Sequence, residues 1–280
     1  MFSLSPEDEA RQAAERIWLD GFRQPAILIP EGDWGQRVVR AFDNRWLALS
    51  GRAADFRTYD DSSSDYSKAI TGLLHLDQSE QRHKTLQRWL GQKLEFEPRR
   101  RADSDAIFLA ALPGQAQSFA PQLQFHRAAD LPIYATSHAW TGTLNAQQLA
   151  DMKGMILADV PLLVLDQPRR DLSQSLPGIT GPLVRLYAMG MDALDLIPHL
   201  RRLQSSTVES LDGQTGNLFI DPENRILRQT VWVELANPPK ILGYAARLDL
   251  NQFSMDEPPL STELPSPAPV SEVTQSPPNS

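Results

Sequence analysis

The sequence contains no cysteine, and this absence excludes several kinds of chemistry at once. Without a thiol, the chain can form no disulfide, bind no metal through thiolate and use no cysteine nucleophile. It also has no apolar run that approaches the ~20 residues needed to span a bilayer. We therefore expect no transmembrane segment and no thiol chemistry, while the redox compartment stays open.

Familiar catalytic motifs are also missing. The sequence has no Gly-x-Ser-x-Gly elbow, no phosphate loop ending in Gly-Lys-Ser/Thr and no Gly-x-Gly-x-x-Gly fingerprint. No two histidines have the four-residue spacing around a Glu that is typical of a zinc site; they are His75, His83, His126, His138 and His199. We therefore expect no catalytic centre, no metal site and no cofactor.

Positive charge is scarce relative to negative charge. The 27 Lys and Arg residues against 35 Asp and Glu leave a net charge of −8, which argues against a broad basic surface for nucleic acid or anionic lipid. Three arginines at 99–101 are typical of a solvated loop, with a patch for an acidic partner as the alternative. The chain has 280 residues, 41% of them hydrophobic, which suits one large soluble domain or two lobes.

The amino terminus lacks the basic region and apolar core of a secretory leader, so the sequence predicts no signal peptide. It favours a helix instead. Ser5 is a capping residue, Pro6 suits the first turn, and residues 7–9 place acids at the positive end of the helix dipole. Apolar residues then recur at helical spacing as far as Phe22.

The most regular stretch is 105–142. Residues 107–112 are almost all apolar, which is typical of a strand covered on both faces. Pro113 and Gly114 end this strand and begin a helix with one apolar stripe. A second apolar strand follows at 133–136. Strand, helix and strand predict a parallel βαβ unit with a right-handed crossover.

The same alternation precedes this unit and predicts an α/β protein with a doubly wound parallel sheet. The expected elements are a strand at 26–29, a helix at 38–49, a strand at 52–58, helices at 66–74 and 80–90, and a loop at 92–103.

The second half is less regular. We expect a short helix at 147–152, a strand at 155–157, and an irregular segment or short helix at 161–177. Strands are expected at 207–211, 216–220, 226–235 and 243–248, with a tight turn at Gly213–Gly216. A long helix is predicted at 182–203, kinked or shortened by Pro198. Its expected inward face is Leu183, Leu186, Tyr187, Met189, Gly190, Ala193, Leu194 and Ile197. Residues 256–280 hold seven prolines and little apolar bulk, so we predict a disordered tail.

Four stretches together identify a family. They are FSLSPEDEARQAAERIWLDG at 2–21, ILIPEGDWGQRV at 27–38, DAIFLAALPGQAQSFAPQLQF…LPIYATSHAWTG at 105–142, and LDGQTGNLFIDPENRILRQTVWVEL at 211–235. In this order they resemble the C-terminal domain of the penicillin-binding protein activators of the LpoA type (LppC lipoproteins).

The resemblance implies the fold of a type I periplasmic binding protein, with two lobes that each hold a doubly wound parallel sheet. On that template, residues 1–255 form one domain in which 10–130 and 206–250 build mainly one lobe and 131–205 belong to the other. The template places a further segment before Phe2, so we expect the second lobe to be incomplete. Apolar surface near Ile133, Met155 and Leu186 would then be uncovered.

The resemblance also implies a function. Members of this family bind and stimulate a class A penicillin-binding protein, without catalysis, at the periplasmic side of the outer membrane. The amino-terminal cysteine that anchors them is absent, so we expect either a fragment or the product of a truncated gene. The alternative function, suggested by the bilobal template, is a periplasmic solute receptor for an amino acid or a related small molecule.

Two groups of residues are candidates for a cleft or an interface. Glu31, Asp33 and Trp34 follow a parallel strand, at the sheet edge where α/β proteins bind ligands. The structural alternative is that Asp33 caps the next helix and Trp34 packs on it.

The second group is Tyr134, Ser137, His138 and Trp140, at the expected crossing between lobes. Their aromatic and hydroxyl groups could hold a small ligand there. The structural alternative is packing within a hinge.

Overall fold

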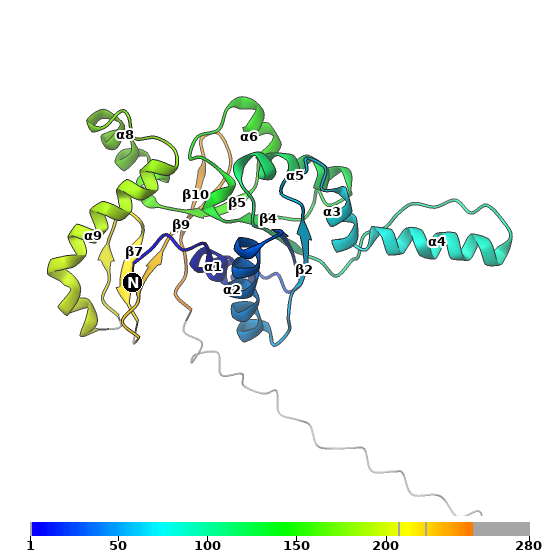
Figure 1. The fold of residues 1–280 in the computed structure, drawn as a ribbon, viewed down its shortest axis with the longest axis horizontal. Coiled ribbons are helices and arrows are strands. Elements are labelled where there is room, and N and C mark those ends of the chain that lie inside the picture. Colours follow the sequence, from blue (N-terminus) through cyan, green and yellow to red (C-terminus); the bar gives the residue numbers. More distant parts are fainter. Residues whose placement is uncertain (1, 207, 222, 249–280) are drawn as a thin grey trace, which may run out of the picture. The chain divides into compact units, whose positions relative to one another are not determined.

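The computed structural model describes residues 2–206, 208–221 and 223–248 (Figure 1). The predicted tail at 256–280 lies outside the described residues. Within them, no helix combines the length and the apolar character needed to cross a bilayer.

A seven-stranded sheet with the order β10-β9-β5-β4-β3-β1-β2, here called the large sheet, organises the fold. The five strands β1 to β5 are parallel, whereas β9 runs antiparallel to β5 and β10 antiparallel to β9. The predicted α/β class with a parallel sheet is therefore confirmed. The strands are β1 (Pro25–Pro30), β2 (Asp55–Tyr59), β3 (Ala106–Leu109), β4 (Ile133–Ala135), β5 (Ile156–Asp159), β9 (Val231–Glu234) and β10 (Lys240–Tyr244).

Both faces of the large sheet are covered, and β1 and β3 are accordingly apolar at every position. In β1, Ile27 and Ile29 join the core on one face, while Ala26 and Leu28 join the core on the other. The first face carries α1 (Pro6–Leu19) and α2 (Asp33–Ser50) (Figure 1). The second carries α3 (Ser67–Leu73), α5 (Pro113–Phe125), the 3-10 helix η1 (Ser137–Ala139), α6 (Ala146–Met152), α7 (Pro161–Val164) and α8 (Asp166–Ser175). The helix α4 (Leu76–Leu90) follows α3.

The helix starts follow the capping chemistry that the sequence indicates. In α1, the Ser5 side chain accepts a hydrogen bond from the Asp8 N–H at 3.3 Å, and Pro6 occupies the first turn. The helix α5 likewise begins at Pro113. The predicted βαβ unit is confirmed, since β3 and β4 pair in parallel on either side of α5 in the sequence.

A second, antiparallel sheet, here called the small sheet, contains β6 (Leu211–Asp212), β7 (Asn217–Ile220) and β8 (Ile226–Gln229). The helix α9 (Pro182–Gln204) packs on it through a small core of Leu196, Leu203, Leu218 and Ile220. The turn between β6 and β7 is held from α9, because the buried Asp192 carboxylate accepts from the N–H groups of Gln214 at 2.6 Å and Thr215 at 2.8 Å.

The strand pairing differs from the division into lobes that the family template suggested. The strand β4 pairs with β3, and β5 pairs with β4, so the strands of residues 131–159 extend the same sheet as those of residues 10–130. The expected exposed surface near Met155 is absent because β5 lies between β4 and β9, and Met155 is buried.

The predicted inward face of the long helix is wrong. The residues that α9 buries are Val184, Arg185, Ala188, Asp192, Leu196 and Leu203, whereas Leu183, Leu186, Leu194 and Ile197 are exposed. The apolar pattern gave the wrong face because Arg185 and Asp192 lie on the buried one. Their burial is possible because both are hydrogen-bonded there. Nor does Pro198 shorten the helix, which continues to Gln204.

Candidate functional site

The loop after β1 brings three of the predicted residues to the carboxyl edge of the large sheet. A Cβ at Gly35 would lie 2.0 Å from the carbonyl oxygen of Pro30, so only glycine lets α2 begin this close to the strand. The N-cap of α2 is Gly32, without a side-chain cap, so the alternative role of Asp33 as the capping residue is not observed. Glu31 and Asp33 are exposed, and Trp34 is half-buried.

Trp34 meets another predicted residue, His138, which follows β4. Their ring centroids are 5.7 Å apart with the planes tilted by 53°. Within the described structure, the buried Nδ1 of His138 has no hydrogen-bond partner, and neither has the buried Oγ1 of Thr136 two residues earlier. The structure therefore brings Trp34 and His138 together at the carboxyl edge of the large sheet. Glu31 lies three residues before Trp34, and its N–H donates to the carbonyl oxygen of Tyr59 at the end of β2 at 2.9 Å.

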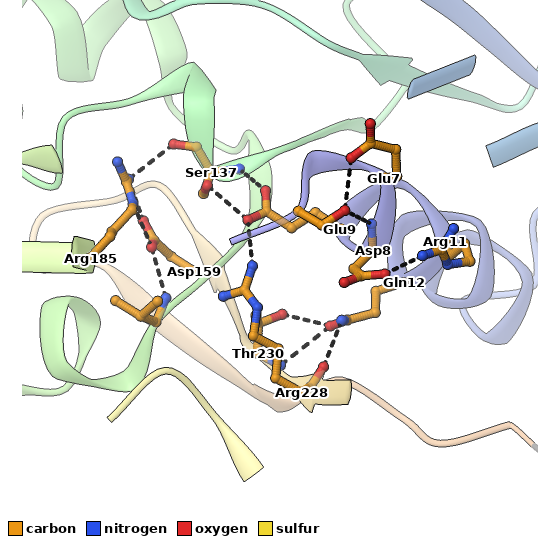
Figure 2. A network of polar contacts seen from close by, with 12 residues as sticks. Glu7, Asp8, Glu9, Arg11, Gln12, Ser137, Asp159, Arg185, Arg228 and Thr230 are labelled. Carbon is orange, nitrogen blue, oxygen red and sulfur yellow. Dashed lines mark hydrogen bonds and ion pairs between the residues drawn. The ribbon is translucent and has the colours of Figure 1, made fainter. Parts of the chain in front are cut away.

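Ser137 points away from this surface and into a buried polar network (Figure 2). Its N–H and its hydroxyl donate to the two carboxylate oxygens of Glu9 from α1, at 2.8 Å and 3.0 Å. The buried Arg228 of β8 also reaches Glu9, with Nη2 3.4 Å from Oε1. Glu9 thus connects α1, the end of β4 and the small sheet.

A second charged pair completes the network. Arg185 of α9 donates from Nε and Nη2 to the two carboxylate oxygens of Asp159, at 2.8 Å and 2.6 Å (Figure 2). The indole N–H of Trp140 donates to the same carboxylate at 2.6 Å. Burial alone would lower the pKa of Arg185, but the adjacent Asp159 carboxylate outweighs it and raises this pKa above its usual value.

Arg185 also fixes the segment after β4. Its Nη2 donates to the carbonyl oxygens of Ser137 at 3.0 Å and Trp140 at 3.2 Å. One guanidinium therefore holds the end of β5, the η1 turn and α9 together in a water-poor environment. A charge pair of this kind is costly to break on one side, because the remaining charge stays buried.

Gln12 of α1 contributes a third connection to the strands of the second half. Its amide donates to the carbonyl oxygen of Arg228 at 2.8 Å, and the Thr230 hydroxyl donates to its Oε1 at 2.6 Å (Figure 2). The small sheet is thus attached to the large sheet largely through polar groups of α1, β5 and α9.

Tyr134 lies apart from the other predicted residues. It is buried under α1, where its hydroxyl donates to the Asp20 carboxylate at 2.6 Å and its ring meets Phe22 edge-on at 6.2 Å. Burial, with the Asp20 carboxylate adding to it, raises the pKa of Tyr134 well above its usual value. The side chain is therefore a neutral hydrogen-bond donor within the core.

The sequence pattern did not single out Glu9, Asp159, Arg185 or Arg228. Two signals were available. Asp159 ends a parallel strand, where α/β proteins concentrate functional groups. Arg185 is a charged residue inside an apolar stretch of helix, and such a residue needs a buried partner if that side of the helix is covered.

The network is satisfied mainly by its own groups and has no free nucleophile–base pair. Ser137 donates to a carboxylate that is already paired with an arginine, so its hydroxyl is not activated. Over the described ranges, no group of three or more histidine, aspartate or glutamate side chains could hold a metal ion. A cavity of about 640 Å³ lies near the opposite ends of the strands, where Phe22, Arg100 and Lys153 are among its lining residues.

Comparison with known proteins identifies the family of this chain. The family model described as "LppC putative lipoprotein" matches residues 1–237. A curated relative, penicillin-binding protein activator LpoA from Vibrio cholerae serotype O1, is 31% identical over 237 residues, which are 83% of this chain and 39% of the relative. The chain thus spans about two fifths of the length of the curated relatives it matches.

Solved structures agree. The C-domain of LpoA from Haemophilus influenzae, described as a regulator of PBP1A, matches with a TM-score of 0.65 and 28% identity over 86% of this chain and 68% of that domain. The leucine-binding protein LivK from Thermotoga maritima matches with a TM-score of 0.54 at 13% identity, covering 86% of this chain and 65% of that one, which shows likeness of fold alone. The expected resemblance to periplasmic binding proteins is confirmed at the level of the fold.

Proposed function

The chain belongs to the LppC lipoprotein family, and on this basis we propose that it is a non-catalytic regulator that binds and stimulates a class A penicillin-binding protein in peptidoglycan assembly. The observation that carries the proposal is the match of residues 1–237 to the family, together with the likeness to an LpoA C-domain described as a regulator of PBP1A. By the same family membership, the proposed location is the periplasmic side of the outer membrane.

The mechanism we propose is a shift of the synthase between two conformations. A protein that binds the active conformation of an enzyme more tightly than the inactive one raises the population of the active form, without taking part in the chemistry. The polar network around Glu9 and Asp159 supports this view, since most of its groups bond to one another and connect structural elements.

We further propose the surface formed by Glu31, Asp33, Trp34 and His138 as a contact site for this partner. It combines exposed carboxylates with a half-buried aromatic pair, and aromatic residues supply much of the binding energy in protein interfaces. Tyr134, Ser137 and Trp140 are proposed as supporting residues only, because their side chains are buried.

The test is direct. The purified chain is titrated onto the class A penicillin-binding protein of the same organism by surface plasmon resonance, and peptidoglycan cross-linking is followed with and without it. We expect saturable binding and more cross-links per synthase. Trp34→Ala should weaken binding, whereas Phe125→Ala, which alters a side chain that is 82% exposed at the end of α5, should not. Absence of both binding and stimulation would exclude the proposed function.

The solute receptor is the second candidate, and one observation favours it. The Nδ1 of His138 and the Oγ1 of Thr136 are buried near the carboxyl edge and have no hydrogen-bond partner among the described residues, as polar groups that bind a ligand would. A thermal-shift screen of amino acids and muropeptides separates the two functions. A rise of several degrees at millimolar ligand would favour the receptor, since ligand bound to the folded state stabilises it.

A further inference from the structure

The helix α4 and the segment 91–99 that returns from it, here called the arm, project away from the large sheet (Figure 1). The return segment packs along one side of the helix. The ring of Phe96 stacks on His83 with centroids 4.1 Å apart, and the amide of Gln87 donates to the carbonyl oxygen of Leu94 at 3.4 Å. The arm is thus a helix with one side covered by its own chain and another side exposed to solvent.

The outer part of the arm, residues 81–94, is here called the tip, and it carries three exposed large apolar side chains. Leu86, Trp89 and Leu90 have exposed fractions of 47%, 79% and 58%. Their spacing of i, i+3 and i+4 places them side by side on the helix. Single apolar side chains on a surface are ordinary, but a contiguous patch rimmed by polar groups is typical of an interaction site.

The tip is positively charged although the chain as a whole is acidic. It contains no aspartate or glutamate, while the whole chain has a net charge of −8. Its exposed cations are Arg82, Lys84, Arg88 and Lys93. Over the part of the chain that the structure describes, none of these cations takes part in an ion pair. The surface that fits the tip is therefore both apolar and negatively charged.

The acidic body of the chain does not cancel the charge of the tip. From Leu76 to Trp89 the helix rises by about 20 Å, at about 1.5 Å per residue. Charges are screened over about 8 Å at physiological ionic strength. The nearest acids, Glu95 and Glu97, flank the Phe96 ring that stacks on His83, about two turns before Trp89. The end of the arm therefore presents its positive charge largely unopposed.

We propose that the tip of the arm binds the surface of a membrane that contains anionic phospholipids. A helix with Trp and Leu beside Lys and Arg is typical of segments that lie in the interface of a bilayer. Cations near an anionic bilayer add to the attraction, and tryptophan favours the level of the headgroups. The net charge argues against a broad basic surface, but this patch is local. It lies at the end of a projecting helix and not in a groove, so a fluid surface fits it without a preformed complement.

Other occupants fit the arm less well. A second copy would bring the same cations against one another, and like charges repel. The segment that the family template places before Phe2 belongs to the second lobe, and Phe2 itself packs on the small core beside α9. The arm instead follows α3, which packs beside β2 at the opposite edge of the large sheet. An acidic groove on a folded protein is the remaining alternative, and vesicles distinguish it from a bilayer.

The first experiment measures sedimentation of the full chain with vesicles. Vesicles of phosphatidylethanolamine with about one quarter phosphatidylglycerol are compared with vesicles of phosphatidylcholine alone. We expect binding to the anionic vesicles only, and we expect added salt to weaken it because screening shortens the reach of the cations. Absence of binding to anionic vesicles, or equal binding to both kinds, overturns the proposal.

The apolar patch is tested by Trp89→Ala, which should weaken binding to anionic vesicles at least tenfold. The matched control is Phe125→Ala, which removes an aromatic side chain that is 82% exposed on α5, outside the arm, and should leave binding unchanged. Circular dichroism of each variant checks that it is folded. Binding that survives Trp89→Ala unchanged would place the contact elsewhere and refute the assigned site.

The charge is tested by Arg88→Glu, with Arg201→Glu as its control. Both arginines are exposed in the last turn of a helix, so each change replaces a cation with an anion in the same helical setting. Arg88→Glu should weaken binding at least tenfold, whereas Arg201→Glu should change it little. Equal weakening by both would mean that net charge alone governs binding, which contradicts a specific role for the arm.

The last experiment locates the contact by fluorescence. Trp89 is exposed, whereas the other tryptophans are buried or half-buried, so lipid at the tip acts on Trp89 first. On anionic vesicles its emission should shift to shorter wavelength, and brominated lipids should quench it. Trp89→Phe keeps an aromatic side chain in the patch, so this variant should still bind but lose the quenching. Quenching that persists in Trp89→Phe would show that another part of the chain meets the lipid, and the model would be wrong.

Discussion

The large sheet and the small sheet are stabilised in different ways, although one chain forms both. The large sheet is apolar on both faces and is held between two layers of helices by aliphatic and aromatic packing. The small sheet has a core of four buried apolar residues and depends on Asp192, Arg228 and Gln12 for its attachment. Apolar burial tolerates small shifts, whereas hydrogen-bonded charges require one geometry. The difference predicts where each substitution will act.

The largest effect is expected in the large sheet. Phe108 is fully buried in β3, and its ring stacks on Phe42 with centroids 4.6 Å apart. Phe108→Ala removes these contacts and leaves a cavity, so the free energy of unfolding should fall by about 3–5 kcal/mol. Urea denaturation measures it, with the exposed Phe125→Ala as the control. A loss no larger than that of the control would contradict two-sided packing as the main source of stability.

The connection between the two sheets should show the next largest effect. Arg185→Leu leaves the buried Asp159 carboxylate without its cation, which should cost about 3 kcal/mol. Adding Asp159→Asn removes the stranded charge and keeps an acceptor for the Trp140 N–H, so the double variant should recover part of the loss. Additive losses in denaturant unfolding would mean that the pair does not act as a unit.

A change within the small sheet should act locally. Leu218 is fully buried between β7 and α9, and Leu218→Ala should destabilise this small core by about 2 kcal/mol, at the low end for such changes because the core is thin. Hydrogen exchange should become faster in β6, β7, β8 and the second half of α9, while β1 and β3 keep their protection. If exchange also became faster in β1 and β3, the two sheets would unfold as one unit.

The smallest effect concerns pH and the loop that leads into the large sheet. Arg101 donates to Asp103 at 2.8 Å and 2.7 Å and also pairs with Asp55 at the start of β2. Hydrogen bonds from Arg101 lower the pKa of Asp103 from 3.8 to about 2. Since the folded pKa lies below the unfolded one, the contribution of this pair is present above about pH 4 and is lost as the pH falls through 2.

The side chain of Asp103 is more than half exposed, so this contribution is small. Pepsin cleavage at 91–105 should become faster between pH 4 and pH 2 than the general rise in pepsin activity explains, relative to cleavage elsewhere in the chain. Arg101→Met should remove this pH dependence. A loop whose relative cleavage is the same in the variant and the wild type would argue against a role for the pair.

The sequence predicted the large sheet well because its signals are local. The apolar strands at 26–29 and 107–112, the Pro113–Gly114 break and the Ser5–Pro6 cap each depend on neighbours within a few residues. Prediction failed at the inward face of α9 and at the uncovered apolar surface expected near Met155. Both depend on partners far along the chain: Asp159 for Arg185, and β9 for β5. The proposed contact role of Trp34 and His138 stays a prediction.

By itself, the sequence determined the α/β class, the order of most helices and strands, and the family, since periodicity, capping and stretches of matching residues are properties of consecutive positions. Only the tertiary structure decided which of the candidate residues meet. It buried Tyr134 against Asp20, turned Ser137 toward Glu9 128 residues away, and left His138 half-buried beside Trp34. The physical reason is that a buried charge must find its counter-charge wherever the chain brings one, and sequence spacing carries no record of that distance.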